Sequence, residues 1–140
     1  MAVGRYLVDK SALARWDRPQ VRSALAPLVE HGLVATCGII ELEVLYSARD
    51  KPDYKTIKKD RRLAYKWLPT ADADLERAIE VQGALAERGR LRAVSLPDLV
   101  VAAVAERHRV CVLHYDADYE HITDVTGQRT LWVVPRGDVP

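Results

Sequence analysis

Four short apolar segments divide this chain, and between them hydrophobic residues recur at helical spacing. The apolar segments are residues 6–8, 33–37, 110–113 and 131–134. Runs of this length are typical of strands buried inside a sheet. Because these strands alternate with helical patterns along the whole chain, the sequence predicts an α/β sandwich around a mostly parallel sheet.

The helical patterns fill the intervals between the apolar segments. We expect helices at residues 11–16, from Pro19 to His31, from Gly38 through Leu45, and at 51–66, 72–88, 99–105 and 119–125. The chain has 140 residues and shows no internal repeat, linker or low-complexity segment. It is therefore predicted to form a single domain over residues 1–140.

Bulk composition excludes several classes of protein. The 21 basic and 20 acidic residues give a net charge of +1, so an argument for nucleic acid must rest on where the charges lie. No apolar stretch approaches the roughly 20 residues needed to span a membrane, and the first residues lack the order of a signal peptide. Cys37 and Cys111 lie in apolar runs, which favours buried thiols in a reducing compartment. We therefore expect a cytoplasmic protein with no membrane association.

Four carboxylates occupy equivalent positions in the alternation of strands and helices. Asp9 follows the first strand, Glu41 lies in the first turn of the helix after the second, Asp98 lies in the first turn of the helix before strand 110–113, and Asp116 follows that strand. Each alone has a local explanation as a helix cap or first-turn acid. Together they meet at one edge of a parallel sheet, where ligands bind.

Four acids in one crevice require a counter-charge. Two carboxylates about 5 Å apart repel each other by roughly 3 kcal/mol at an effective dielectric constant of about 20. An all-oxygen acidic site suits Mg²⁺ or Mn²⁺, and no His or Cys is placed to make it a zinc site. One or two such ions would activate a water for phosphodiester hydrolysis.

Four sequence motifs resemble those of PIN domains. Residues 6–11, YLVDKS, are similar to the opening strand, in which Asp is followed two residues later by Ser or Thr. Residues 36–42, TCGIIEL, resemble the second motif with Glu41 as its acid. Residues 96–105, LPDLVVAAVA, fit the third pattern D-x-x-x-A-A-x-A. Residues 112–119, VLHYDADY, resemble the fourth, with Asp118 and Tyr119 in place of the frequent Asp-Phe.

The resemblance covers the whole chain and is closest to the VapC toxins of toxin–antitoxin pairs. It implies a three-layer α/β/α sandwich and a Mg²⁺-dependent endoribonuclease, with Mn²⁺ as a possible substitute. It also implies an RNA substrate, a homodimer and a VapB-type antitoxin. Asp9, Glu41, Asp98 and Asp116 are the implied catalytic acids. Asp9, Asp98 and Asp116 would bind the metal, and Ser11, Glu41 and Asp118 would contact it through water.

Several neighbouring residues carry separate expectations. His114 stands where many members carry Thr or Ser, and Ser47 stands where Gly is common. Glu43 lies about 200° around the helix from Glu41 and is expected to point away from the crevice. Asp118 is expected mainly to cap the helix that begins near Tyr119.

A basic segment follows the second motif. The residues interpreted as a possible RNA phosphate-binding surface are Lys51, Lys55, Lys58, Lys59, Arg61 and Arg62. An acidic crevice needs nearby cations to admit a polyanion. The alternative is a solvated helix face without a ligand.

Other functions remain open at this point. A structure-specific DNA nuclease could use the same chemistry, although the chain has no long arch or extra helical module. A haloacid-dehalogenase phosphatase would need a second Asp at position 11, which is Ser11 here. A catalytically weak RNA-binding or interaction domain would be expected to have lost one of the four acids. The apolar segments 99–105 and 33–45 are expected to supply a homodimer face.

Overall fold

The computed structural model describes residues 5–140 and contains one sheet of five strands. The strands are β1 (Tyr6–Val8), β2 (Val34–Thr36), β3 (Lys66–Trp67), β4 (Cys111–His114) and β5 (Thr130–Trp132). Their order across the sheet is β3-β2-β1-β4-β5, and every pair is parallel. All the strands therefore end at the same edge, which the sequence predicted.

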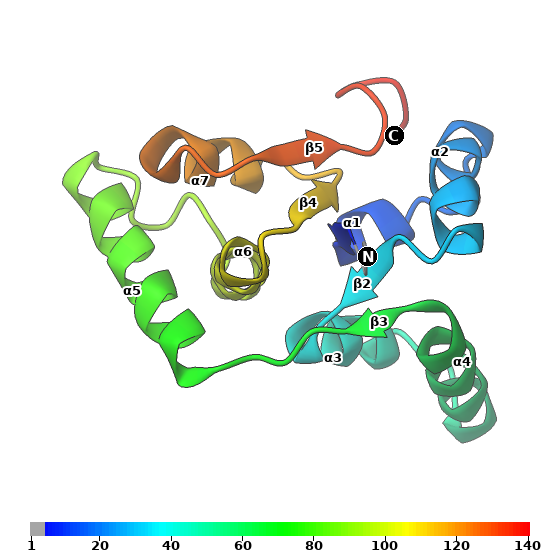
Figure 1. Cartoon of the computed structure of the whole chain (residues 1–140). Helices are drawn as coiled ribbons and strands as arrows, with labels where there is room; N and C mark the ends of the chain where they lie inside the picture. Colours follow the sequence, from blue (N-terminus) through cyan, green and yellow to red (C-terminus); the bar gives the residue numbers. More distant parts are fainter. Residues whose placement is uncertain (1–4) are drawn as a thin grey trace.

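Helices cover both faces of the sheet. They are α1 (Lys10–Leu13), α2 (Pro19–Glu30), α3 (Gly38–Tyr46), α4 (Lys51–Ala64), α5 (Asp72–Glu87), α6 (Leu96–His108) and α7 (Asp118–Thr126). Figure 1 shows α5, α6 and α7 on one side of the sheet and α1 and α2 on the other, with α3 and α4 forming a pair next to β3. The arrangement is a three-layer α/β/α sandwich.

The central strands are continuous apolar runs because helices cover both faces of the sheet. Leu7 of β1 and Val112 of β4 belong to the core under α3, α5, α6 and α7. Val8 and Leu113, the next residues along the same strands, pack into the second core with α1, α2 and the C-terminal segment. Successive side chains of a strand point to opposite faces, so continuous apolar runs are what this position requires.

Two features of the fold differ from the predicted elements. The predicted helix 51–66 ends earlier, and Lys66 and Trp67 form strand β3, an exposed edge strand without apolar alternation. Helix α6 is longer than the predicted 99–105. Most of that segment is buried in the core, so the expectation that the whole segment supplies an intermolecular face is wrong.

Segment 33–45 divides into two parts. Its strand is largely buried, whereas Leu42 is 67% exposed and Val44 and Leu45 are half-buried, so a homodimer face on this segment stays a prediction for its second half alone. Within residues 5–140, no helix is long and apolar enough to cross a membrane.

Candidate metal-binding active site

Three carboxylates converge where strand β4 ends and helices α6 and α7 begin. Asp98 lies in the first turn of α6, Asp116 lies two residues past β4, and Asp118 opens α7. One carboxylate oxygen from each lies within 4.8 Å of the other two. The structure thus brings Asp98 and Asp116 together, as expected, and adds Asp118 as an equal member of the group.

Asp98 is the most deeply buried of the three acids, with 6% of its surface exposed. Its Oδ1 atom contacts the hydroxyl of Tyr119 at 3.3 Å, whereas its buried Oδ2 atom has no hydrogen-bond partner. The pKa of Asp98 is raised to about 9, mainly because the carboxyl is buried. The negative charge of Asp9 is the second cause, and Asp116 and Asp118 raise the pKa further. This carboxyl therefore holds a proton at neutral pH unless a cation takes its place.

Asp9 follows strand β1 and lies next to this group, connected to Asp98 through the Tyr119 hydroxyl, and it is also the N-cap of α1. Its Oδ2 accepts hydrogen bonds from the Ser11 backbone N–H at 3.0 Å and from the Ser11 hydroxyl at 2.6 Å. The Ser11 hydroxyl in turn accepts the Tyr115 N–H at 2.9 Å. Ser11 therefore ties the end of β1 to the end of β4, and its hydroxyl proton is already committed to Asp9.

A turn after β4 fixes Asp116 and Asp118 relative to each other. The Asp118 N–H donates to Asp116 Oδ1 at 2.9 Å, and the Ser95 N–H donates to Asp118 Oδ2 at 3.0 Å. Asp118 makes no side-chain cap of α7, so the expectation that it mainly caps this helix is wrong. Its carboxylate instead connects the start of α7 to the start of α6.

His114 anchors the same turn from the last position of β4. Its imidazole is fully buried between the rings of Tyr119 and Trp132, at centroid distances of 4.6 and 5.0 Å. Burial lowers the pKa of His114 to about 4, so the ring is neutral at neutral pH. Its Nδ1 can therefore accept the Asp116 N–H, at 3.1 Å.

Glu41 does not join this cluster, and its predicted placement in the crevice is corrected. Arg61 of α4 contacts its carboxylate through Nε at 2.9 Å and through Nη2 at 2.6 Å. The Thr36 hydroxyl donates a further hydrogen bond to the same carboxylate. Both Glu41 oxygens are thus engaged in a partly buried ion pair that joins β2, α3 and α4.

Glu43 is half-buried and lies within the electrostatic reach of Asp9. Burial raises the pKa of Glu43, and the negative charge of Asp9 raises it further, so this carboxyl lies on the Asp9 side of α3. The expectation that Glu43 points away is wrong. The angular separation of Glu41 and Glu43 shows that only one can face the crevice, but nothing in the sequence of α3 alone indicated which one.

The donor set fits a hard divalent cation. It consists of carboxylate oxygens, the ligands preferred by Mg²⁺ and Mn²⁺. The buried and unpartnered Oδ2 atom of Asp98 has no neighbour to satisfy it among the described residues. A buried polar atom of this kind carries a desolvation cost that a bound cation would remove.

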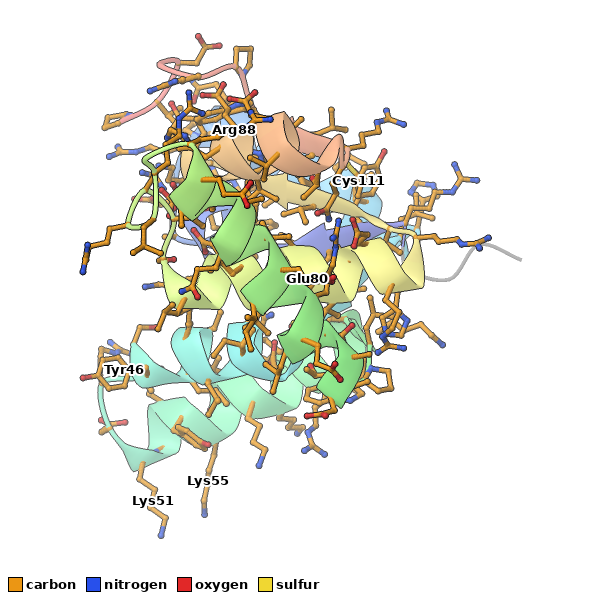
Figure 2. All side chains as sticks on the ribbon, turned by 90° about the vertical axis from the view of Figure 1, so that its left-hand side faces the viewer. Tyr46, Lys51, Lys55, Glu80, Arg88 and Cys111 are labelled. Atoms are coloured by element: carbon orange, nitrogen blue, oxygen red, sulfur yellow. The ribbon has the colours of Figure 1, made fainter. Side chains whose placement is uncertain are left out.

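The cations of α4 divide into one buried residue and several exposed ones. Arg61 is 8% exposed and bound to Glu41, so its predicted role on an RNA-facing surface is corrected. The other predicted cations, Lys51, Lys55, Lys58, Lys59 and Arg62, are exposed. In Figure 2, Lys51 and Lys55 extend into solvent at the end of the molecule opposite Cys111, where β4 begins. They therefore lie toward the side on which the strands end.

Comparison with known proteins places this architecture in a family. A family model described as "PIN domain" matches residues 6–125. Ribonuclease VapC21 of Mycobacterium tuberculosis is 48% identical over 133 residues, covering 95% of this chain and 96% of the relative. Ribonuclease VapC51 of the same organism is 41% identical over 135 residues, covering 96% of this chain and 97% of the relative. The chain therefore belongs to the PIN domain family, in the group of the VapC ribonucleases.

Solved structures share the fold at low sequence identity. The DNA-bound VapBC complex of Salmonella typhimurium contains a chain with a TM-score of 0.74 and 12% identity, covering 94% of this chain and all of that one. A chain of the DNA-bound VapBC2 complex of Rickettsia felis gives a TM-score of 0.73 at 11% identity, with 90% and 96% covered. The three-layer fold is thus shared with chains of these complexes.

Proposed function

We propose that this protein is a divalent-cation-dependent endoribonuclease, the toxin of a VapBC-type toxin–antitoxin pair acting in the cytoplasm. The observation that carries the proposal is the buried carboxyl of Asp98, which has an unpartnered oxygen and lies with Asp116 and Asp118 in a group of oxygens within 4.8 Å. The names of the relatives, all ribonucleases, support RNA as the substrate.

Five acids of this chain would act at the site. Asp9, Asp98 and Asp116 would hold Mg²⁺, or Mn²⁺ in its place, together with Asp118. Glu43 takes the role that the motif resemblance implies for Glu41, because it lies within the electrostatic reach of Asp9 whereas Glu41 is paired with Arg61. When bound, the cation lowers the pKa of a ligated water and neutralises charge on the phosphate. Ser11 and His114 hold Asp9 and Asp116 in place through the hydrogen bonds described above.

RNA would approach along the exposed cations of α4. An acidic cleft repels a polyanion, and lysines on the same side of the molecule offset that repulsion by binding phosphates. Lys51, Lys55, Lys58, Lys59 and Arg62 are exposed and suited to this role. Arg61 is excluded from it, because its guanidinium is bound to Glu41.

We also propose a VapB-type antitoxin partner and a homodimer. A groove between α3 and α4 is lined by apolar side chains, among them Leu42, Leu45 and Trp67, with Lys58 and Arg62 at its border. Such a groove suits a partner segment that is apolar and carries negative charge. The VapBC complexes that share this fold support an antitoxin as that partner.

Cleavage of defined RNA by the purified protein tests the proposed activity. We expect cleavage with Mg²⁺ or Mn²⁺, none in EDTA, and none by Asp98→Asn under any of these conditions. Single-stranded DNA of matching sequence and branched duplex DNA should both remain intact, which distinguishes this function from a structure-specific DNA nuclease. Cleavage that persists in EDTA, or that survives Asp98→Asn, would contradict the mechanism.

A further inference from the structure

We infer that the hydroxyl of Tyr119 is a positioning group that orients Asp9 and Asp98 for the cation. This inference rests on the metal site of the proposed function and names a residue outside the acids. Tyr119 lies in the first turn of α7 and its side chain is fully buried. Its hydroxyl contacts Asp9 Oδ1 at 2.9 Å and Asp98 Oδ1 at 3.3 Å. One side chain of α7 thus bridges the acids of β1 and α6.

The stoichiometry of this contact gives the hydroxyl its role. A phenol carries one proton, and two carboxylate oxygens face it. The proton can be donated to only one of the two oxygens at a time, and the contact holds Asp9 Oδ1 and Asp98 Oδ1 against the same hydroxyl. Ser11 takes the other oxygen of Asp9, and Asp98 Oδ2 stays free. Without the hydroxyl, no side chain among the described residues donates a hydrogen bond to Asp98.

The ring of Tyr119 is held beside the acids by an aromatic contact. His114 is fully buried, and the centroids of the two rings are 4.6 Å apart. The position of the ring therefore does not depend on the hydroxyl alone.

Groups that orient metal ligands influence affinity strongly. Removing such a partner typically costs about 10- to 100-fold in metal affinity or activity. We expect Tyr119→Phe to bind Mn²⁺ about tenfold more weakly than the unchanged protein. The substitution removes only the hydroxyl, and the ring keeps its stacking on His114, so the fold should be retained.

A titration with Mn²⁺ measures metal affinity separately from RNA cleavage. The free ion is monitored through its electron paramagnetic resonance signal. Tyr115→Phe is the matched control. The Tyr115 hydroxyl donates to the Val139 carbonyl at 2.7 Å and accepts the Gly137 N–H, so its removal eliminates structural hydrogen bonds without touching an acid. Mn²⁺ affinity should fall in Tyr119→Phe and remain unchanged in Tyr115→Phe.

The outcomes separate this inference from the proposed function. If the unchanged protein binds no Mn²⁺, both fail. If it binds Mn²⁺ and Tyr119→Phe binds equally well, the positioning role is overturned and the metal site stands. The rise in melting temperature on adding Mn²⁺ is a second readout, compared within each variant, so a lower starting stability does not obscure it. An equal rise in Tyr119→Phe and the unchanged protein would also overturn the inference.

Discussion

Asp98 is the single residue whose surroundings are least compatible with its charge. It is buried, it contacts an uncharged hydroxyl, and its nearest charged neighbours are the carboxyls of Asp9, Asp116 and Asp118. A carboxyl in such a place either keeps its proton or binds a cation. Without a bound cation, Asp98 destabilises the folded protein. A neutral residue at this position would remove the repulsion between the carboxyls.

This environment predicts how stability depends on pH. The pKa of Asp98 is about 9 in the folded protein and close to 3.8 when unfolded, so the folded state holds one more proton between these values. The free energy of unfolding should then fall as pH rises towards 9, by at most about 1.4 kcal/mol per pH unit for one proton. His114 has the opposite effect, because its pKa is lowered, but that contribution is complete above about pH 6.5.

Urea denaturation in EDTA at about pH 7 and pH 8.5 measures this slope. Cys37, whose pKa is raised from its ordinary 9.0 to about 11, contributes a loss of stability in the same direction near the upper limit, and Asp98→Asn retains that contribution and so serves as its reference. The unchanged protein should lose stability between the two values, and Asp98→Asn should lose much less. Saturating Mg²⁺ should flatten the slope of the unchanged protein. A slope identical in Asp98→Asn and the unchanged protein would assign the dependence to other groups.

Glu41 and Glu43 give a second prediction at this scale. Glu43→Gln should lower the cleavage rate and leave the fold intact, because it removes a carboxyl that lies within the electrostatic reach of Asp9 and makes no hydrogen bond to the rest of the described fold. Glu41→Gln should leave cleavage nearly unchanged and lower stability by about 1–3 kcal/mol, since it weakens an ion pair that is mostly buried. Single-turnover cleavage and thermal melts of both variants measure this. Loss of cleavage in Glu41→Gln at unchanged stability would restore Glu41 as the catalytic acid.

At the scale of elements, periodicity predicts most of the fold. The strands at β1, β2, β4 and β5 and the seven helices are predicted in order, because apolar runs and helical spacing both report burial directly. Strand β3 escapes prediction because Lys66 and Trp67 pair only at the exposed edge, beside Ala35 and Thr36. Such a strand is defined by its hydrogen bonds to a neighbour distant in sequence, which a local pattern cannot contain.

For the candidate site, the sequence predicts the edge of the sheet at which the acids lie, but not which side chains of the helices face it. Positions at strand ends indicate that Asp9, Asp98 and Asp116 share one edge, because topology alone brings them there. The roles of Glu43 and Tyr119 depend on how α3 and α7 are rotated against the sheet. That rotation is set by tertiary contacts such as the pairing of Glu41 with Arg61 of α4. No local spacing in α3 contains that partner.

Helix α4 is predicted to bind RNA through its exposed lysines. Lys51→Gln and Lys55→Gln remove exposed cations from the side on which the strands end. The logarithm of the RNA association constant falls as the logarithm of the salt concentration rises. For each phosphate that is no longer neutralised, this decline should become less steep by about 0.7. Fluorescence anisotropy over a salt series, with Asp98→Asn as background to prevent cleavage, measures the change. Arg22→Gln on α2, which also removes one positive charge, is the control, and an equal effect there would point to bulk charge instead.

At the scale of the whole molecule, apolar side chains remain exposed outside the two cores. Leu75 and Ile79 of α5 and Leu96 at the start of α6 are 46%, 67% and 66% exposed. They border one shallow apolar depression with Leu99 and Val100. Clustered exposed hydrophobic side chains of this kind mark protein interfaces. We propose this face, which includes Leu99 and Val100 from segment 99–105, as the homodimer surface.

The homodimer can be tested by placing a charge in this face. A self-complementary interface meets its own copy across a two-fold axis, so Ile79→Glu would bury two like charges at once. We expect the unchanged protein to sediment as a dimer at micromolar concentration and Ile79→Glu as a monomer with an unchanged fold. Leu63→Glu, at an 81% exposed position of α4, supplies the control and should remain dimeric. A dimer that persists in Ile79→Glu but dissociates in Leu63→Glu would move the interface to α4, where it would compete with the RNA-binding and antitoxin surfaces.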